Sequence, residues 1–298
     1  RDVAVTGVQT CALPIWLDAE QRFAAKADAA VLRIAERMRG YEVALRAGAG
    51  LFDASDDVSA DEWRRFTQRL DLPNHYPGIQ GLGFTAALRG PEVEAFDRAQ
   101  RKAGREGFHT FPRLDSRPNP SSIVYLEPAN WRNARALGFD MGSEPVRREA
   151  MERARDTGGA ALSGRVRLVQ ETNEGVQAGT LMYWPVYRPG ARLDSPAARA
   201  DALQGHVYAA FRMDDLMAGI LGPGSPSLIL TLYDGAEDSD AARLHRSGEA
   251  RPQAEFEARR TLTVSGRTWS MHVASTPLFE RSEEHTSELQ SRLHLVCR

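Results

Sequence analysis

The chain has little cysteine and almost no lysine. Its two cysteines, Cys11 and Cys297, lie near the two ends, so the long region between them can form no disulfide, thiolate metal site or cysteine nucleophile. Lys26 and Lys102 are the only lysines among 38 basic residues. We attribute this preference for arginine to a GC-rich genome, because no arginine cluster is interleaved with aromatic residues as in a phosphate-binding surface.

Several motifs that carry chemistry are also missing. The sequence has no Gly-rich phosphate loop, no GxSxG elbow and no paired carboxylates in a fitting context. The histidines between the ends form no HExxH motif or close ligand pair; they are His75, His109, His206, His245 and His272. The net charge of -2 argues against a nucleic-acid partner. We therefore expect no metal, no cofactor and no catalysis in this chain.

The two end segments match a translated sequencing adapter. Arg281 to Ser291 reads RSEEHTSELQS, the in-frame translation of a common library adapter, and Val5 to Ile15 reads VTGVQTCALPI, the translation of its reverse complement. We therefore expect residues 1–16 and 281–298 to be adapter-derived artefacts and exclude them from fold reasoning. The sequence has no signal peptide and no apolar run of transmembrane length. This absence leaves the location open, because membrane helices would flank the domain where the adapter begins.

A long helix from Asp18 to Ala54 is the first organised element. Its apolar residues recur at steps of three and four, namely Phe23, Ala27, Val31, Ile34, Met38, Tyr41 and Leu45. Such a stripe suits a helix that lies on its own domain, and it equally suits a stalk that pairs with a second copy as a coiled coil. A second helix is predicted from Ala60 to Leu70, with Ser59 as its N-cap.

The rest of the chain reads as strands interrupted by short helices. In a first unit, extended runs are Ile79 to Ala86, Phe108 to Phe111, Ser122 to Leu126, Ala161 to Gln170 and Gly179 to Tyr187, with helices at Pro91 to Ala103 and Glu144 to Asp156. After a joint at Pro189 to Ala202, a second unit comprises Gly205 to Phe211, a helix at Asp214 to Ile220, Ser227 to Leu232, Ala242 to His245, and a hairpin from Arg260 to Ser275 that turns at Ser265-Gly266. Because strands outnumber helices without regular alternation, we predict an α+β fold with antiparallel sheets.

An ordered set of short motifs resembles the CHASE domain, the extracytoplasmic sensor module of plant cytokinin-receptor histidine kinases and of many bacterial histidine kinases and nucleotide cyclases. The matching segments are Arg46 to Phe52 (RAGAGLF), Tyr76 to Phe84 (YPGIQGLGF), Glu127-Pro128, Leu137 to Met141 (LGFDM), Arg147-Arg148, Ala154 to Gly158 (ARDTG), Leu168 to Gln170, Pro185 to Tyr187, and the Gly205 strand with Phe211-Arg212. The resemblance covers nearly all of Leu17 to Glu280.

The resemblance implies a stalk helix (residues 17–58), a membrane-distal PAS-like ligand-binding subdomain (59–190) and a membrane-proximal PAS-like subdomain (203–280), flanked by transmembrane helices. In cytokinin-binding members an aspartate hydrogen-bonds the adenine ring of the ligand, and Asp140 matches it. Leu162 and Thr172 match two further pocket residues. The alternative reading of Asp140 is support of the helix end that follows it, where Ser143 is the predicted N-cap and Pro145 lies in the first turn. The alternative readings of Leu162 and Thr172 are core packing and a loop hydroxyl.

Tyr183 shares a strand face with Tyr187, and this face lines either the pocket or the core. Three functions are open at this point. The first is a periplasmic, small-molecule-sensing domain of a truncated inner-membrane receptor, a histidine kinase or diguanylate cyclase, with an adenine-derivative-like or other ligand and homodimerisation through the stalk. The second is a dimerisation module without a ligand. The third is a soluble enzyme of unrecognised type.

Overall fold

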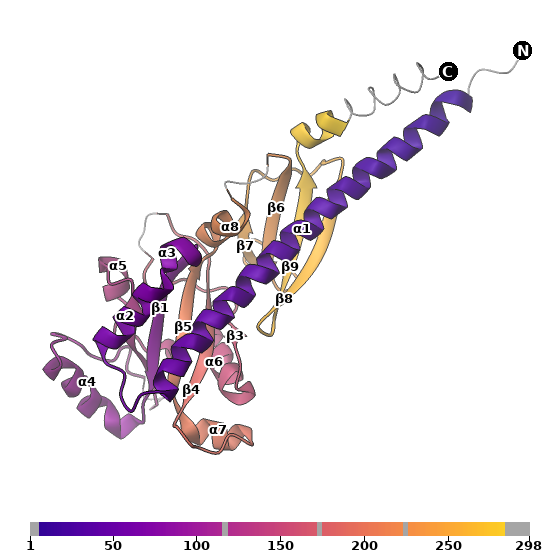
Figure 1. The fold of residues 1–298 in the computed structure, drawn as a ribbon. Coiled ribbons are helices and arrows are strands. Elements are labelled where there is room, and N and C mark those ends of the chain that lie inside the picture. Colours follow the sequence, from indigo (N-terminus) through magenta and orange to yellow (C-terminus); the bar gives the residue numbers. More distant parts are fainter. Residues whose placement is uncertain (1–5, 115–118, 172–174, 223–225, 284–298) are drawn as a thin grey trace, which may run out of the picture.

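The computed structural model describes residues 6–114, 119–171, 175–222 and 226–283, and it has the predicted α+β fold (Figure 1). A single long helix, α1 (Thr6–Asp53), runs along two antiparallel sheets of five and four strands. The helix was expected to begin at about Asp18, and it begins further back, inside the segment assigned to the adapter. None of the described helices is both long and apolar enough to cross a bilayer.

The five-stranded sheet has the strand order β2-β1-β5-β4-β3. Its strands are β1 (Ile79–Ala87), β2 (Ser121–Glu127), β3 (Ala161–Leu162), β4 (Gly179–Tyr187) and β5 (Leu203–Arg212). The Gly205 strand was expected in the second unit, whereas β5 lies in the first sheet, where it pairs with β1 on one side and β4 on the other. The physical reason is that consecutive antiparallel strands usually pair. The Pro/Gly-rich segment before β5, which includes α7 (Pro196–Ala202), returns the chain to the same sheet.

Two predicted strands are much shorter than expected. Of the run from Ala161 to Gln170, only the first two residues form a strand, with an isolated bridge at Val166. Phe111 likewise contributes only a bridge, to Phe139. The chain leaves the sheet edge at Gly164, where a Cβ atom would lie 2.7 Å from a guanidinium nitrogen of Arg267. After β3 the chain therefore passes close to the second sheet, where the Arg165 N–H donates to the Asp234 carboxylate at 2.8 Å.

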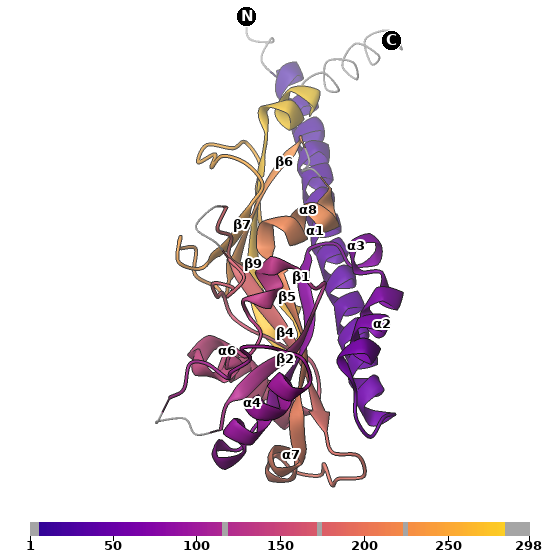
Figure 2. The same cartoon turned by 90° about the vertical axis from the view of Figure 1, so that its left-hand side faces the viewer.

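Helices cover both faces of the five-stranded sheet (Figure 2). One face lies against α1 and α2 (Ala60–Leu70), and the other against α6 (Pro145–Thr157). Shorter helical elements are α3 (Leu72–His75), η1 (Gly90–Glu92), α4 (Val93–Lys102), α5 (Trp131–Ala134) and η2 (Met141–Ser143). The predicted cap of α2 is confirmed: Ser59 Oγ accepts from the Glu62 N–H at 3.2 Å, and the Glu62 carboxylate accepts from the Ser59 N–H at 2.8 Å. This reciprocal capping box satisfies two backbone donors that a helix start leaves unpaired.

The second sheet has the strand order β7-β6-β9-β8. Its strands are β6 (Leu228–Asp234), β7 (Arg243–Arg246), β8 (Glu257–Val264) and β9 (Arg267–Ser275). Helix α8 (Met213–Leu221) connects it to β5, and a last described helical stretch covers residues 277–283. The hairpin turns at Ser265-Gly266, as predicted.

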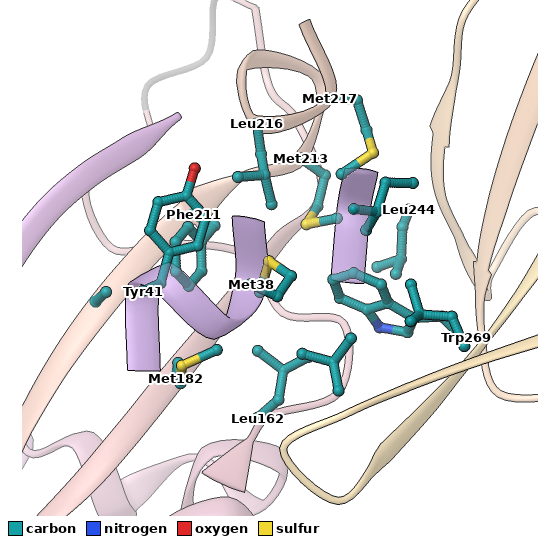
Figure 3. Packing of buried hydrophobic residues seen from close by; sticks show 14 of the residues in the cluster. Met38, Tyr41, Leu162, Met182, Phe211, Met213, Leu216, Met217, Leu244 and Trp269 are labelled. Atoms are coloured by element: carbon teal, nitrogen blue, oxygen red, sulfur yellow. The ribbon is translucent and has the colours of Figure 1, made fainter. Parts of the chain in front are cut away.

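The apolar stripe of α1 packs within its own chain. Phe23, Ala27, Ile34, Met38, Tyr41 and Leu45 are at most 2 % exposed, and all belong to one core cluster. That cluster also contains Leu162 of the first sheet and Trp269 of the second (Figure 3). Of the two readings of the stripe, the structure therefore selects a helix that lies on its own domain. The stripe joins both sheets into one core.

Candidate ligand site between the first sheet and helix α6

Asp140 is buried just before η2 and binds backbone. Its Oδ1 atom accepts from the Ser121 N–H at 2.7 Å and from the Gly142 N–H at 3.0 Å, and the residue is 1 % exposed. The carboxylate thus fastens the start of β2 to η2. A charged acceptor shared by two buried backbone donors is a strong local restraint.

Helix α6 is capped by Glu144, whereas the sequence predicted Ser143. The Glu144 carboxylate accepts from the N–H groups of Val146 and Arg147, both at 3.0 Å. Ser143 instead donates from its hydroxyl to the Asp140 carbonyl at 2.6 Å. The predicted Pro in the first turn is confirmed at Pro145. The residue that caps a helix is the one directly before its first turn. Here Ser143 belongs to η2, so Glu144 takes the cap position of α6.

Leu162 and Tyr183 lie on opposite faces of the first sheet. Across the β3–β4 pair, Tyr183 is opposite Ala161, and Leu162 is opposite Met182. Because alternate residues of a strand point to opposite faces, Tyr183 joins the cluster beneath α6 and Leu162 joins the core along α1. Thr172 lies outside the described residues. The structure therefore brings Tyr183 to the side of Asp140, where its hydroxyl is 3.9 Å from Met141 Sδ, and leaves Leu162 on the other side.

A layer of buried polar side chains lies between the sheet and α6. We call it the polar layer, and it consists of Thr85, Arg147, Tyr183, His206 and Tyr208, each at most 3 % exposed. Four of its atoms find no hydrogen-bond partner within the described part of the chain: Thr85 Oγ1, Arg147 Nε, His206 Nδ1 and Tyr208 Oη. Leaving a buried polar group unpaired costs about 1–3 kcal/mol. Such a concentration of unpaired groups is what a polar ligand can satisfy.

The contacts of the polar layer fix its chemistry. Arg147 donates from Nη2 to the Arg167 carbonyl at 2.7 Å, its guanidinium lies 5.1 Å from the centre of the Phe139 ring, and its Nε is 4.0 Å from a Glu144 carboxylate oxygen. His206 Nε2 lies 3.0 Å from the Met151 carbonyl and therefore donates to it, which leaves Nδ1 of the neutral ring as an acceptor. The layer thus offers the Arg147 cation, the His206 Nδ1 acceptor and hydroxyl groups, all shielded from bulk water.

Burial determines the protonation states of this layer. It raises the pKa of both Tyr183 and Tyr208 above the ordinary value, so both phenols stay protonated. It lowers the pKa of His206 to about 4, so this ring is neutral at pH 7. The two tyrosine rings lie 6.2 Å apart between centroids, and Tyr183 lies 6.0 Å from the His206 ring.

An open cleft reaches the polar layer at one end of the sheet. Its volume is about 1110 Å³, and its lining includes His206 of the polar layer, Met151, and Ser121, whose N–H donates to Asp140. Neither Asp140 nor Leu162 nor Tyr183 lines the cleft itself. Charges of both signs surround it: Arg89, Arg148, Arg155 and Arg188, with Asp56, Asp57, Glu92, Glu152 and Asp201. A ligand in the cleft would be next to the polar layer.

Sequence reasoning missed Thr85, Arg147, His206 and Tyr208 as site residues, although β5 carried a usable signal. His206 and Tyr208 alternate with Val207, Ala209 and Phe211, so in the buried part of this strand, residues 205–211, one face carries polar side chains and the other is apolar. Its central position in the sheet was needed to see that both faces are covered. Among the described residues, no group of three His, Cys, Asp or Glu side chains is arranged to hold a metal ion.

Comparisons with known proteins identify the family of the chain. The CHASE domain family matches residues 56–245, which include the whole first sheet, the polar layer and part of the second sheet. The chain is 31 % identical over 193 residues to "Probable histidine kinase 6" of Oryza sativa subsp. japonica. The match covers 63 % of this chain and 19 % of that kinase, so the chain spans about a fifth of the length of that relative. The chain belongs to the CHASE domain family, a family of sensor domains.

Proposed function

We propose that this chain is the extracytoplasmic, small-molecule-sensing domain of a transmembrane receptor whose output is a histidine kinase or a diguanylate cyclase. The CHASE family and the kinase relative support a sensing role. The observation that carries the ligand proposal is the polar layer, in which four buried polar atoms lack a hydrogen-bond partner among the described residues and one member, His206, lines an open cleft. Binding sites of this kind are apolar with a few placed polar groups.

The ligand is proposed to contact Arg147, Tyr183, His206 and Tyr208, with Asp140 at the edge of the same site. The other matched pocket positions, Leu162 and Thr172, enter the proposal only as positions carried over from the family. The proposed ligand is a small polar molecule, of which adenine derivatives are one class. The ligand-binding unit is proposed to extend through β5, and the second unit to begin at α8.

A series of contacts leads from α6 to the long helix. Arg153 of α6 donates to the Leu162 carbonyl at 2.6 Å, and the Leu162 N–H donates to the Ser265 carbonyl at 3.1 Å. The Ser265 hydroxyl in turn donates to the Glu42 carboxylate of α1 at 2.5 Å. We propose that a ligand beneath α6 biases this connection, which it can do only if it binds the two arrangements with different affinity.

The ligand proposal predicts a shift in melting temperature. We expect at least one compound from a library of small metabolites, adenine derivatives included, to raise the melting temperature of the chain by mass action. Tyr208→Phe removes one unpaired buried hydroxyl and should reduce that rise. Tyr233→Phe, on the second sheet, is the matched control and should keep it. Differential scanning fluorimetry measures both, and a compound that stabilises all three proteins equally would place the site elsewhere.

The receptor context is tested by recovering the native gene across both adapter junctions with long sequencing reads. Apolar transmembrane segments flanking the domain, followed by a kinase or cyclase domain, are the expected result. A continuous reading frame without them would exclude the extracytoplasmic assignment.

We propose that the receptor dimerises through the outer face of α1. The inner stripe is used by the core, but Leu32 and Val43 are 60 % and 64 % exposed. They lie about three helical turns apart on one side of α1. Leu32→Glu should convert a dimer into a monomer, whereas Leu193→Glu, a control at an exposed loop leucine, should not. Light scattering gives the mass directly, and a wild-type chain that is monomeric at tens of micromolar contradicts the proposal.

A further inference from the structure

A second cavity lies between α1, α8 and the second sheet, away from the polar layer. Its volume is about 430 Å³, within the range of small-molecule sites. Its apolar lining comes from all three structures and includes Ala30, Met217, Leu221, Leu230 and Val273. These side chains come from α1, α8 and the second sheet, and none comes from a strand of the first sheet. The cavity is therefore distinct from the site beneath α6.

Three cationic side chains line this cavity, namely Lys26, Arg33 and Arg246. Lys26 and Arg33 are about two helical turns apart on the same side of α1. Neither has a hydrogen bond or an ion pair with any described residue. Arg246 donates from Nε to Thr231 Oγ1 at 3.3 Å. None of the three positive charges thus has an ion-pair partner among the described residues.

The negative groups at the cavity are fewer. Asp214 is its one acidic lining residue among those described, and its Oδ1 lies 2.6 Å from Nδ1 of His245, which also lines the cavity. Helix α8 ends at the cavity with Leu221 and Gly222, and a helix C-terminus carries a partial negative charge. Three cations outweigh one paired carboxylate and one short helix end. The cavity therefore has a net positive charge at its rim and an apolar lining beneath it.

We propose that this cavity binds a small organic anion with an apolar body, a carboxylate or a sulfonate. The anionic group would lie at the rim between Lys26, Arg33 and Arg246, and the body would cover Leu230 and Met217. Because α8 directly follows β5, such a ligand would act where the two sheets are connected. This site is a second input, independent of the ligand proposed beneath α6.

Isothermal titration calorimetry with naphthalene-2-sulfonate and the full 298-residue chain tests the proposal. We expect saturable binding of this anion and none of 2-naphthylmethylammonium, which has the same apolar body and the opposite charge. The double variant Lys26→Glu/Arg33→Glu should weaken binding of the sulfonate by about tenfold or more, because reversing two charges at the exposed rim of the cavity removes attraction and adds repulsion. Arg39→Glu, an exposed position on α1 outside the cavity, is the matched control and should bind as the wild type does.

A steric variant gives an independent readout. Ala29→Trp fills the cavity from an exposed position on α1 and should abolish binding without touching a charge. Equal binding of the cation, or unchanged binding by both the double variant and Ala29→Trp, would overturn the proposal. Tyr208→Phe should leave this binding unchanged, so failure here and failure of the site beneath α6 are separate results.

Discussion

We expect Asp140→Ala to lower the free energy of unfolding by about 4 kcal/mol. The substitution removes the acceptor of two backbone N–H groups, those of Ser121 and Gly142, and both residues are buried. Each buried donor left unpaired costs about 1–3 kcal/mol, and bonds to a charged acceptor are at the upper end. Urea unfolding followed by circular dichroism measures the difference.

Asp140→Asn is the informative control for this position. The amide keeps one oxygen that can accept both N–H groups, so we expect it to cost only about 1 kcal/mol. The Asn variant is therefore folded well enough for ligand titration, and a lost thermal shift in it would indicate ligand contact by the carboxylate. If Asp140→Ala is as stable as the wild type, the carboxylate does not hold η2 to β2.

The free energy of unfolding should fall as the pH is lowered from about 6.5 to about 4, and His206 should account for roughly 3 kcal/mol of that fall. Burial lowers the pKa of this ring in the folded state to about 4. In the unfolded chain an ordinary histidine binds its proton near pH 6.5, so between these two pH values the unfolded state holds the extra proton. The stabilisation is therefore complete above about pH 6.5 and is lost as the pH falls toward 4.

His206→Gln separates this effect from other titrations. Glutamine cannot titrate, yet its amide can still donate to the Met151 carbonyl as His206 Nε2 does. We expect urea unfolding at pH 5 to 7 to show a much smaller pH slope for this variant. Glu280, whose pKa is lowered to about 2 by Arg251, acts only below about pH 4.5, outside this window. Parallel slopes for wild type and His206→Gln would rule out the buried neutral histidine.

Local features of the fold followed from local sequence. The capping box at Ser59 and Glu62 was predictable because it needs only two side chains three residues apart. The strand from Gly179 to Tyr187 has the predicted bounds. A nearly continuous buried run of this length indicates a strand and marks where it begins and ends. The apolar stripe of α1 was equally visible, because its period is that of a helix.

The candidate site was less predictable. Tyr183 and Leu162 were both proposed for one pocket, but the register of β3 against β4 places them on opposite faces. A shift of one residue in this register would place Leu162 on the same face as Tyr183. No short sequence pattern sets that register. From the sequence, Arg147 was part of a predicted helix and of the Arg147-Arg148 motif, and neither indicated that its guanidinium is buried beneath the sheet.

By itself, the sequence determined the α+β class, the long amphipathic helix, the α2 cap and the resemblance that the family comparison confirms. These depend on periodicity and on contacts a few residues apart, which a single chain displays directly. Only the tertiary structure decided that β5 belongs to the first sheet, that the α1 stripe is buried in its own chain, and that five distant polar side chains form one layer. Those outcomes depend on which surfaces pack together across long loops. The free energy of that packing is distributed over many residues, so no single segment of the sequence indicates it.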